Sequence, residues 1–139
     1  MLVIEKINLE ANPYDATDQF QSNVDLTVLA DYEGLQVAGE PDLIVELIDL
    51  FVEDAPVRVA SMRESQAKED WISVKQQAHS LRGSSGSTGA IQMALTCGEL
   101  EAATSIGICP DIEDLLSRLE LELKHTLHIL LANRLRRLQ

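Results

Sequence analysis

The most regular stretch of the sequence is WISVKQQAHSLRGSSGSTG, residues 71–89. Its apolar and small residues recur at alternating spacings of three and four, which is the pattern of one buried face of an α-helix. This inward stripe consists of Trp71, Val74, Ala78, Leu81, Ser85 and Thr88. Gly89 follows directly and suits the left-handed residue that often ends a helix. The stretch therefore predicts a helix over residues 71–88 that buries one defined face.

The residues before this stretch predict two helical segments. We expect a short leading helix at residues 24–29 with Asp25 as its cap, because aspartate accepts hydrogen bonds from amides of the first turn. A longer helix is expected to begin with Pro41 at its first position, where the missing amide proton costs nothing. The apolar residues of that helix recur at helical spacing. They are Leu43, Ile44, Leu47, Ile48 and Phe51.

Pro56 is expected to break this helix. Proline lacks an amide donor and its ring clashes with the preceding turn, so Asp54-Ala55-Pro56 should end one helix and start another. The restarted helix would face inward with Val57, Ala60 and Met62. Lys68-Glu69-Asp70 then reads as a polar turn in which Asp70 caps the helix that begins at Trp71.

Two more helices are expected after residue 89. The inward residues of the first are Ala90, Met93, Ala94, Cys97 and Leu100, and Gly107 and Pro110 mark its end. Asp111 is expected to cap a long last helix, whose basic end suits the negative pole of the helix dipole. The apolar side of that last helix comprises Leu115, Leu116, Leu119, Leu123, Leu127, Leu130 and Leu131.

Short connections between amphipathic helices predict an all-α fold, an up-and-down antiparallel four-helix bundle with an extra N-terminal helix or arm. A chain of 139 residues suits one domain. We expect an N-terminal arm over residues 1–23, which lack sustained periodicity, and a bundle domain over residues 24–139. Only 4% of the residues are aromatic, which disfavours a β-sandwich.

The formal net charge of −12 bears on the partners of the chain. A field of this sign repels phosphate backbones and anionic lipid, so we expect neither nucleic acid nor a membrane surface as a partner. No apolar run approaches the roughly 20 residues that span a bilayer, and the N-terminus has no signal-peptide pattern. Cys97 and Cys109 lack the spacing of a zinc site or a disulfide framework. We therefore expect a cytoplasmic protein. We also expect it to work as a monomer.

A second stripe on the helix at residues 71–88 carries the candidate chemistry. His79, Arg82, Gly83 and Gly86 recur at helical spacing about a third of a turn from the buried stripe, so the imidazole should be reachable from solvent. Each glycine costs roughly 1 kcal/mol in a helix, which suggests a reason other than helix stability. Gly83 would clear the approach of a bulky partner to His79, and Arg82 would offset charge on a transferring phosphoryl group.

Glu101 is expected to complete this site. The chain folds back near Ala90, and His79 and Glu101 lie at equal separations on either side of it, so antiparallel packing should bring them to similar height. Glu101 would accept a hydrogen bond from Nδ1–H of His79, which fixes the tautomer and leaves Nε2 as the nucleophile. A solvated surface role for Glu101 remains the alternative.

These motifs resemble the histidine-containing phosphotransfer (HPt) domain family. The resemblance covers roughly residues 24–133 and rests on Ala78-His79-Ser80-Leu81-Arg82-Gly83-Ser84, then Gly89-Ala90, then Cys97-Gly98-Glu99-Leu100-Glu101. It implies a helical bundle in which His79 is phosphorylated, Gly83 clears the approach and Glu101 orients the imidazole. Arg82 departs from the usual lysine. It keeps the charge but has a bulkier planar head group.

The resemblance also implies partners and a role. The chain would accept a phosphoryl group from a receiver-domain aspartate or a kinase and pass it to another receiver, in response regulators or hybrid sensor kinases. It would be a carrier without ATP-dependent kinase activity of its own. It would need no cofactor, with Mg²⁺ expected on the receiver. Gly83 and Gly86 would lie on the docking surface. The sequence leaves open whether these residues are a free protein or a part of a hybrid kinase.

The sequence also allows other interpretations. An HPt-like bundle could dock a receiver or kinase and regulate it without carrying phosphate. His125 and His128 could share a metal ion, but the chain lacks the paired Glu-x-x-His ligands of metal-binding four-helix proteins, so we expect no metal. The serine- and glycine-rich residues 84–89 could be a linker, but a linker would interrupt the buried stripe. Cys97 is interpreted as a small core residue.

Overall fold

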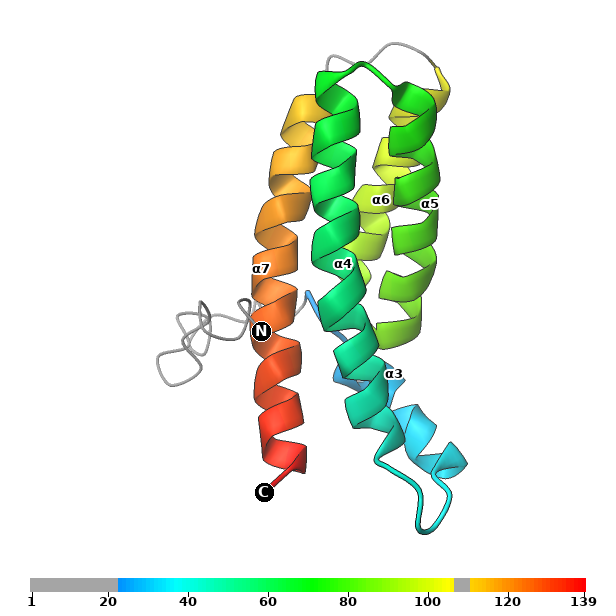
Figure 1. Cartoon of the computed structure of the whole chain (residues 1–139), viewed down its shortest axis with the longest axis vertical. Coiled ribbons are helices and arrows are strands. Elements are labelled where there is room, and N and C mark those ends of the chain that lie inside the picture. Colours follow the sequence, from blue (N-terminus) through cyan, green and yellow to red (C-terminus); the bar gives the residue numbers. More distant parts are fainter. Residues whose placement is uncertain (1–22, 107–110) are drawn as a thin grey trace.

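The computed structural model describes residues 23–106 and 111–139, and all regular structure within them is helical. The elements are α3 (Leu26–Ala30), the 3-10 helix η1 (Asp31–Leu35), α4 (Leu43–Ala67), α5 (Trp71–Thr88), α6 (Ile91–Ser105) and α7 (Ile112–Arg137). Helices α4 to α7 run up and down, and α3 lies near the end of the bundle where α5 leads into α6 (Figure 1). The predicted all-α bundle with an extra N-terminal helix is confirmed. The arm predicted over residues 1–23 lies outside the described residues except for Asn23, as do Gly107 and Pro110.

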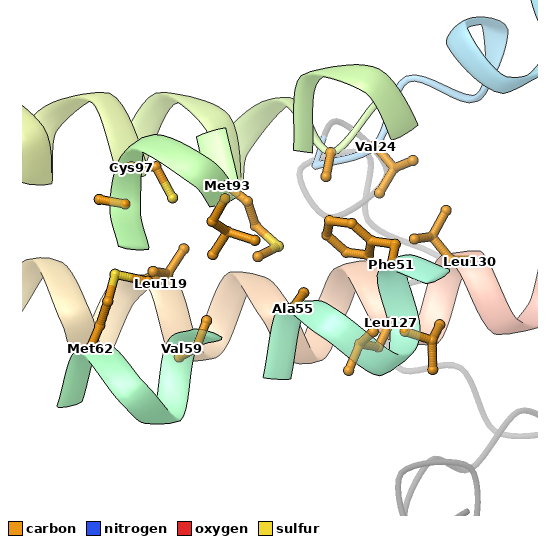
Figure 2. Close-up of a cluster of buried hydrophobic side chains, with 14 of the residues drawn as sticks. Val24, Phe51, Ala55, Val59, Met62, Met93, Cys97, Leu119, Leu127 and Leu130 are labelled. Carbon is orange, nitrogen blue, oxygen red and sulfur yellow. The ribbon is translucent and has the colours of Figure 1, made fainter. Parts of the chain in front are cut away.

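The four long helices close around one core. Helix α5 packs against α4 and α6, and α7 packs against the same two helices from the diagonal position. Side chains from all four meet in this core. Figure 2 shows part of it, in which Phe51 of α4, Met93 of α6 and Leu130 of α7 are labelled. The largest fully buried side chains include Ile48, Met62, Leu81, Met93, Leu100, Leu116, Leu119 and Leu130. None of the described helices is both long enough and apolar enough to cross a membrane.

The stripe predicted on α5 is buried as expected. Val74, Ala78, Leu81 and Ser85 are 0% exposed, Thr88 is 5% exposed, and the partly buried Trp71 packs against the core. Asp70 accepts a hydrogen bond from the backbone amide of Ser73 at 3.1 Å, which confirms the predicted cap. The helix therefore has a fixed start and a fixed rotation about its own axis.

The predicted break at Pro56 is wrong. Helix α4 continues through this residue from Leu43 to Ala67. Proline costs about 3 kcal/mol inside a helix, but Val52, Ala55 and Val59 are all at most 3% exposed on the two sides of it. Their burial against α5 and α7 holds both halves on one axis. The inward face predicted for a restarted helix is wrong as well, apart from Met62. Val57 is 67% exposed and Ala60 is exposed too.

The predicted start of α4 is also displaced. Pro41 precedes the helix, and Asp42 is its N-cap, with the carboxylate accepting from the amides of Ile44 at 3.0 Å and Val45 at 3.2 Å. An aspartate side chain that can bond two orphan amides defines the helix start more strongly than the fixed φ of a proline. The same argument holds for α3, where the predicted cap Asp25 accepts from the amide of Thr27 at 3.0 Å.

The inward faces predicted for α6 and α7 are largely confirmed. Met93, Cys97 and Leu100 are 0% exposed, and the buried leucines of α7 are Leu116, Leu119, Leu127, Leu130 and Leu131. Ala94, Leu115 and Leu123 are only partly buried, whereas Thr96 and Ile112 are buried. Asp111 occupies the N-cap position of α7, but its side chain makes no capping hydrogen bond.

Ion pairs tie the C-terminal end of α7 to the N-terminal part of α4 and to η1. The guanidinium of Arg134 lies 2.5 Å from Asp49, and Arg137 pairs with Asp42 at 3.0 Å and with Glu33 at 2.8 Å. These contacts hold the pKa of both guanidinium groups above the ordinary value, mainly through the hydrogen bonds from Arg134 to Asp49 and from Arg137 to Glu33. Arg134 and Arg137 at the basic end of α7 therefore stabilise the bundle through ion pairs within the chain.

Replacing Gly89 with alanine should destabilise the bundle. Gly89 has a φ of +88°, and an added Cβ would lie 2.3 Å from the carbonyl oxygen of Asp25. A left-handed non-glycine residue costs about 1–2 kcal/mol, so together with this clash we expect a loss of roughly 2–4 kcal/mol in the free energy of unfolding. Urea denaturation monitored by circular dichroism measures this free energy.

The matched control for this prediction is Gly34→Ala. A Cβ at Gly34 meets nothing within 4 Å, so the stability should change by about 0.5 kcal/mol or less. Equal stability of the two variants would contradict the close contact between Gly89 and Asp25.

Candidate functional site

His79 stands on the outward flank of α5. Its neighbour Ala78 and the residue two positions on, Leu81, are both 0% exposed. Because these two residues fix the rotation of the helix, the side chain of His79 must leave the core, and it is 68% exposed. The fold thus presents an imidazole to solvent on a helix that is itself firmly packed.

Glu101 of α6 meets this imidazole from the neighbouring helix. Its Oε2 lies 3.0 Å from Nδ1 of His79, as a hydrogen bond. A carboxylate only accepts hydrogen bonds, so in the neutral ring Nδ1 carries the proton and Nε2 has the free lone pair. The Glu101 side chain is only 15% exposed, which restricts its rotamers and so holds the ring in one orientation. The two residues that the sequence proposed to pair are therefore brought together.

Arg82 reaches the same carboxylate. Its Nε lies 3.2 Å from Oε1 of Glu101, an ion pair without the alignment of a hydrogen bond. The side chain crosses toward α6 and passes over Gly98, where an added Cβ would lie 3.8 Å from Cδ and 3.9 Å from Nη1 of Arg82. The sequence predicted that Arg82 would serve the phosphoryl group. The structure adds a partner within the protein that the sequence reasoning did not anticipate.

Gly83 and Gly86 leave the surface next to His79 without protruding side chains. Both are exposed, and a Cβ at either position would meet nothing within 4 Å. No contact inside the described bundle therefore requires glycine at these positions, although each glycine weakens the helix relative to alanine. The open surface is what a second molecule would need in order to approach the imidazole.

A shallow groove adjoins His79 on the side of the N-terminal turn of α5. It is lined by Ile72, Lys75, Gln76, His79, Ser80 and Glu101. Lys75 stands four residues before His79 on the same helix, and Ile72 is 74% exposed. The stripe of candidate residues predicted from the sequence began at His79 and therefore included neither Lys75 nor Ile72. The spacing of four was the available signal for Lys75.

The remaining candidates lie away from this surface. Cys97 is buried, and burial together with the charges of Glu122 and Glu101 raises the pKa of its thiol to about 12, so it is a core residue. His125 and His128 are buried on α7, and His125 hydrogen-bonds Asn23 at 3.3 Å. Burial lowers the pKa of His125. Among residues 23–106 and 111–139, no three His, Cys, Asp or Glu side chains are grouped to hold a metal ion.

Comparisons with known proteins agree on one family. The model of the Hpt domain matches residues 46–138, which is more than half of the chain. The chain is similar to the crystal structure of histidine-containing phosphotransfer protein B from Pseudomonas aeruginosa PAO1, with a TM-score of 0.76 and 27% identity. That match covers 82% of this chain and 96% of the other. No curated protein matches the sequence.

Replacing Glu101 with alanine should change the tautomer of His79. Without the carboxylate, nothing on α6 holds the proton on Nδ1, and the neutral ring should shift toward the Nε2–H form that solvent favours. The ¹⁵N shifts of the imidazole, measured by long-range ¹H–¹⁵N correlation at alkaline pH, report the change. The control is Glu99→Ala, since Glu99 pairs with Arg118 on the α7 side of α6. An unchanged tautomer in Glu101→Ala would rule out the orienting role.

Proposed function

This chain belongs to the Hpt domain family, and we propose that it accepts a phosphoryl group on His79 and passes it to a receiver domain. The family match and the structural likeness confirm the resemblance drawn from the sequence, and they make the chain a histidine phosphotransfer protein of a phosphorelay. The residue roles and the partners below are our proposal.

The observation that carries the proposal is the contact between Glu101 and His79. An exposed ring with Nδ1 held at 3.0 Å by a carboxylate presents Nε2 as a fixed nucleophile. Phosphoryl transfer needs little covalent chemistry from the protein beyond such positioning and charge stabilisation. A histidine that only served stability would not need an exposed second nitrogen.

The proposed accepting step is an in-line displacement. The lone pair of Nε2 forms the N–P bond while the P–O bond to a receiver aspartate breaks, and that aspartate leaves as a carboxylate. The Nδ1 proton stays on the ring, so the positive charge that the ring gains faces Glu101. Arg82, one turn on and paired with Glu101, adds positive charge near the transferred phosphoryl group. The reverse displacement by another receiver passes the group on.

The proposed partners are receiver domains of response regulators or hybrid sensor kinases, with a kinase as a further phosphoryl donor. The receiver would dock over Gly83 and Gly86, whose missing side chains leave room around the imidazole. Mg²⁺ would be held by the receiver, and the carrier itself would need neither a cofactor nor ATP. We propose that it works as a monomer in the cytoplasm. The net charge of −12 disfavours nucleic acid as a partner.

Phosphotransfer to His79 can be tested with purified proteins. A panel of receiver domains, each phosphorylated with labelled acetyl phosphate and Mg²⁺, is incubated with the chain. We expect label on an acid-labile, alkali-stable site, and none on His79→Gln because amide nitrogen is not a nucleophile of this kind. Label that persists in His79→Gln would refute the proposal. Binding of a receiver without any labelling of the wild-type chain would favour the docking-only alternative.

Replacing Gly83 with alanine should separate stability from function. An alanine meets open space within α5, so the free energy of unfolding should rise by roughly 1 kcal/mol. A methyl group on the docking surface would displace the receiver, and the transfer rate should fall by roughly tenfold or more. Urea denaturation and a phosphotransfer time course measure the two effects.

Gly34→Ala in η1 again provides the control for this prediction, because it also adds a methyl group in open space but lies on a different element from His79. We expect its transfer rate to equal that of the wild type. If Gly83→Ala were stabilised and still transferred at the wild-type rate, the receiver would not dock over Gly83.

A further inference from the structure

We propose that Lys75 is the residue that directly contacts the phosphoryl group on His79, while Arg82 positions Glu101. This inference rests on the proposed phosphorylation of His79 and assigns a further residue to the same site. The reasons are where each of the two cations is placed and what each already binds.

Arg82 is held by a partner within the protein. Its Nε lies 3.2 Å from Oε1 of Glu101, while Oε2 of the same carboxylate binds His79. The Glu101 side chain is 15% exposed, so it has little water to replace a lost cation. If Arg82 turned to the phosphoryl group, it would leave a partly buried carboxylate with less compensation and loosen the group that orients the ring. Arg82 therefore supports the nucleophile best by staying on Glu101.

Lys75, in contrast to Arg82, is not paired with a carboxylate in the described parts of the chain. It is exposed. Residues four apart on a helix have Cβ atoms about 5–6 Å from each other. Helical side chains also lean toward the N-terminus, which carries the imidazole of His79 over the turn that contains Lys75. Both residues line the same groove, together with Ser80 and Glu101.

The chemistry of lysine suits this position. A phosphoryl group on Nε2 carries oxygens with a charge near −2, and the ammonium group has three donors on a flexible stem that can follow them. Glu101 occupies Nδ1 and leaves Nε2 for the phosphoryl group, and Lys75 lines the same groove as His79, which is within reach of the flexible lysine stem. Once a receiver departs with its Mg²⁺, the phosphorylated carrier has only its own cations. Lys75 should therefore stabilise the phosphorylated form, beyond any effect on docking.

The test measures the phosphotransfer equilibrium between the chain and a receiver it labels. Lys75→Gln should shift this equilibrium toward the phosphorylated receiver by roughly three- to tenfold, and Lys75→Arg should restore most of it. The shift of the equilibrium caused by Lys75→Gln should be smaller in 1 M salt, where charges are screened within about 3 Å. The matched control is Lys124→Gln, which makes the same charge change at an exposed site on α7, the helix diagonal to α5.

Two spectroscopic measurements separate the roles of the cations. Lys75→Gln should move the ³¹P resonance of the phosphohistidine and leave the ¹⁵N shifts of the unphosphorylated imidazole unchanged. Arg82→Gln should disturb those ¹⁵N shifts, because it releases Glu101. The inference is overturned if Lys75→Gln matches Lys124→Gln in the equilibrium and in ³¹P shift. It stands apart from the proposed function, which fails only if His79→Gln still takes label or the wild-type chain takes none.

Discussion

The left-handed turn at Gly89 is the constraint on which the site depends. It ends α5, and its carbonyl accepts a hydrogen bond from the amide of Asp25 at 2.8 Å, which anchors the segment leading into α3. Because the turn is so short, it fixes the register between α5 and α6. Each residue of α5 then faces one level of α6, and the level of His79 is that of Glu101. A longer connection would allow the two helices to slide and would separate this pair.

Few contacts of the bundle are needed to position the site. Burial of Ala78 and Leu81 fixes the rotation of α5, so His79 is presented outward by the same packing that stabilises the core. A single carboxylate, that of Glu101, then ties the imidazole and Arg82 to α6. Beyond it, Gly83 and Gly86 weaken the helix, and a Cβ added at either of them would meet nothing within 4 Å. The buried face of α5 thus belongs to the core, and its outward face carries the histidine of the site.

The two errors of the sequence interpretation both concern a proline, but they have different causes. Local rules placed a helix break at Pro56 and a helix start at Pro41, since proline is a strong signal in a short window. In the folded chain, burial on both sides of Pro56 keeps α4 continuous, and the two hydrogen bonds accepted by Asp42 define its start. Contacts with other helices outweighed the local preference in the first case, and a competing cap did so in the second. Periodic apolar patterns, as on α5, were reliable because they already encode those contacts.

The sequence by itself determined the helical class, the buried face of α5 and the turn at Gly89, and it predicted the pairing of His79 with Glu101 that the structure shows. These follow from the spacing of residues along helices joined by a short turn, which a linear pattern records. Only the tertiary structure decided that Arg82 binds Glu101 across to α6, that Lys75 shares a groove with His79, and that α4 runs unbroken. The direction of a long charged side chain depends on which groups other helices bring near it, and that information is spread over the whole fold.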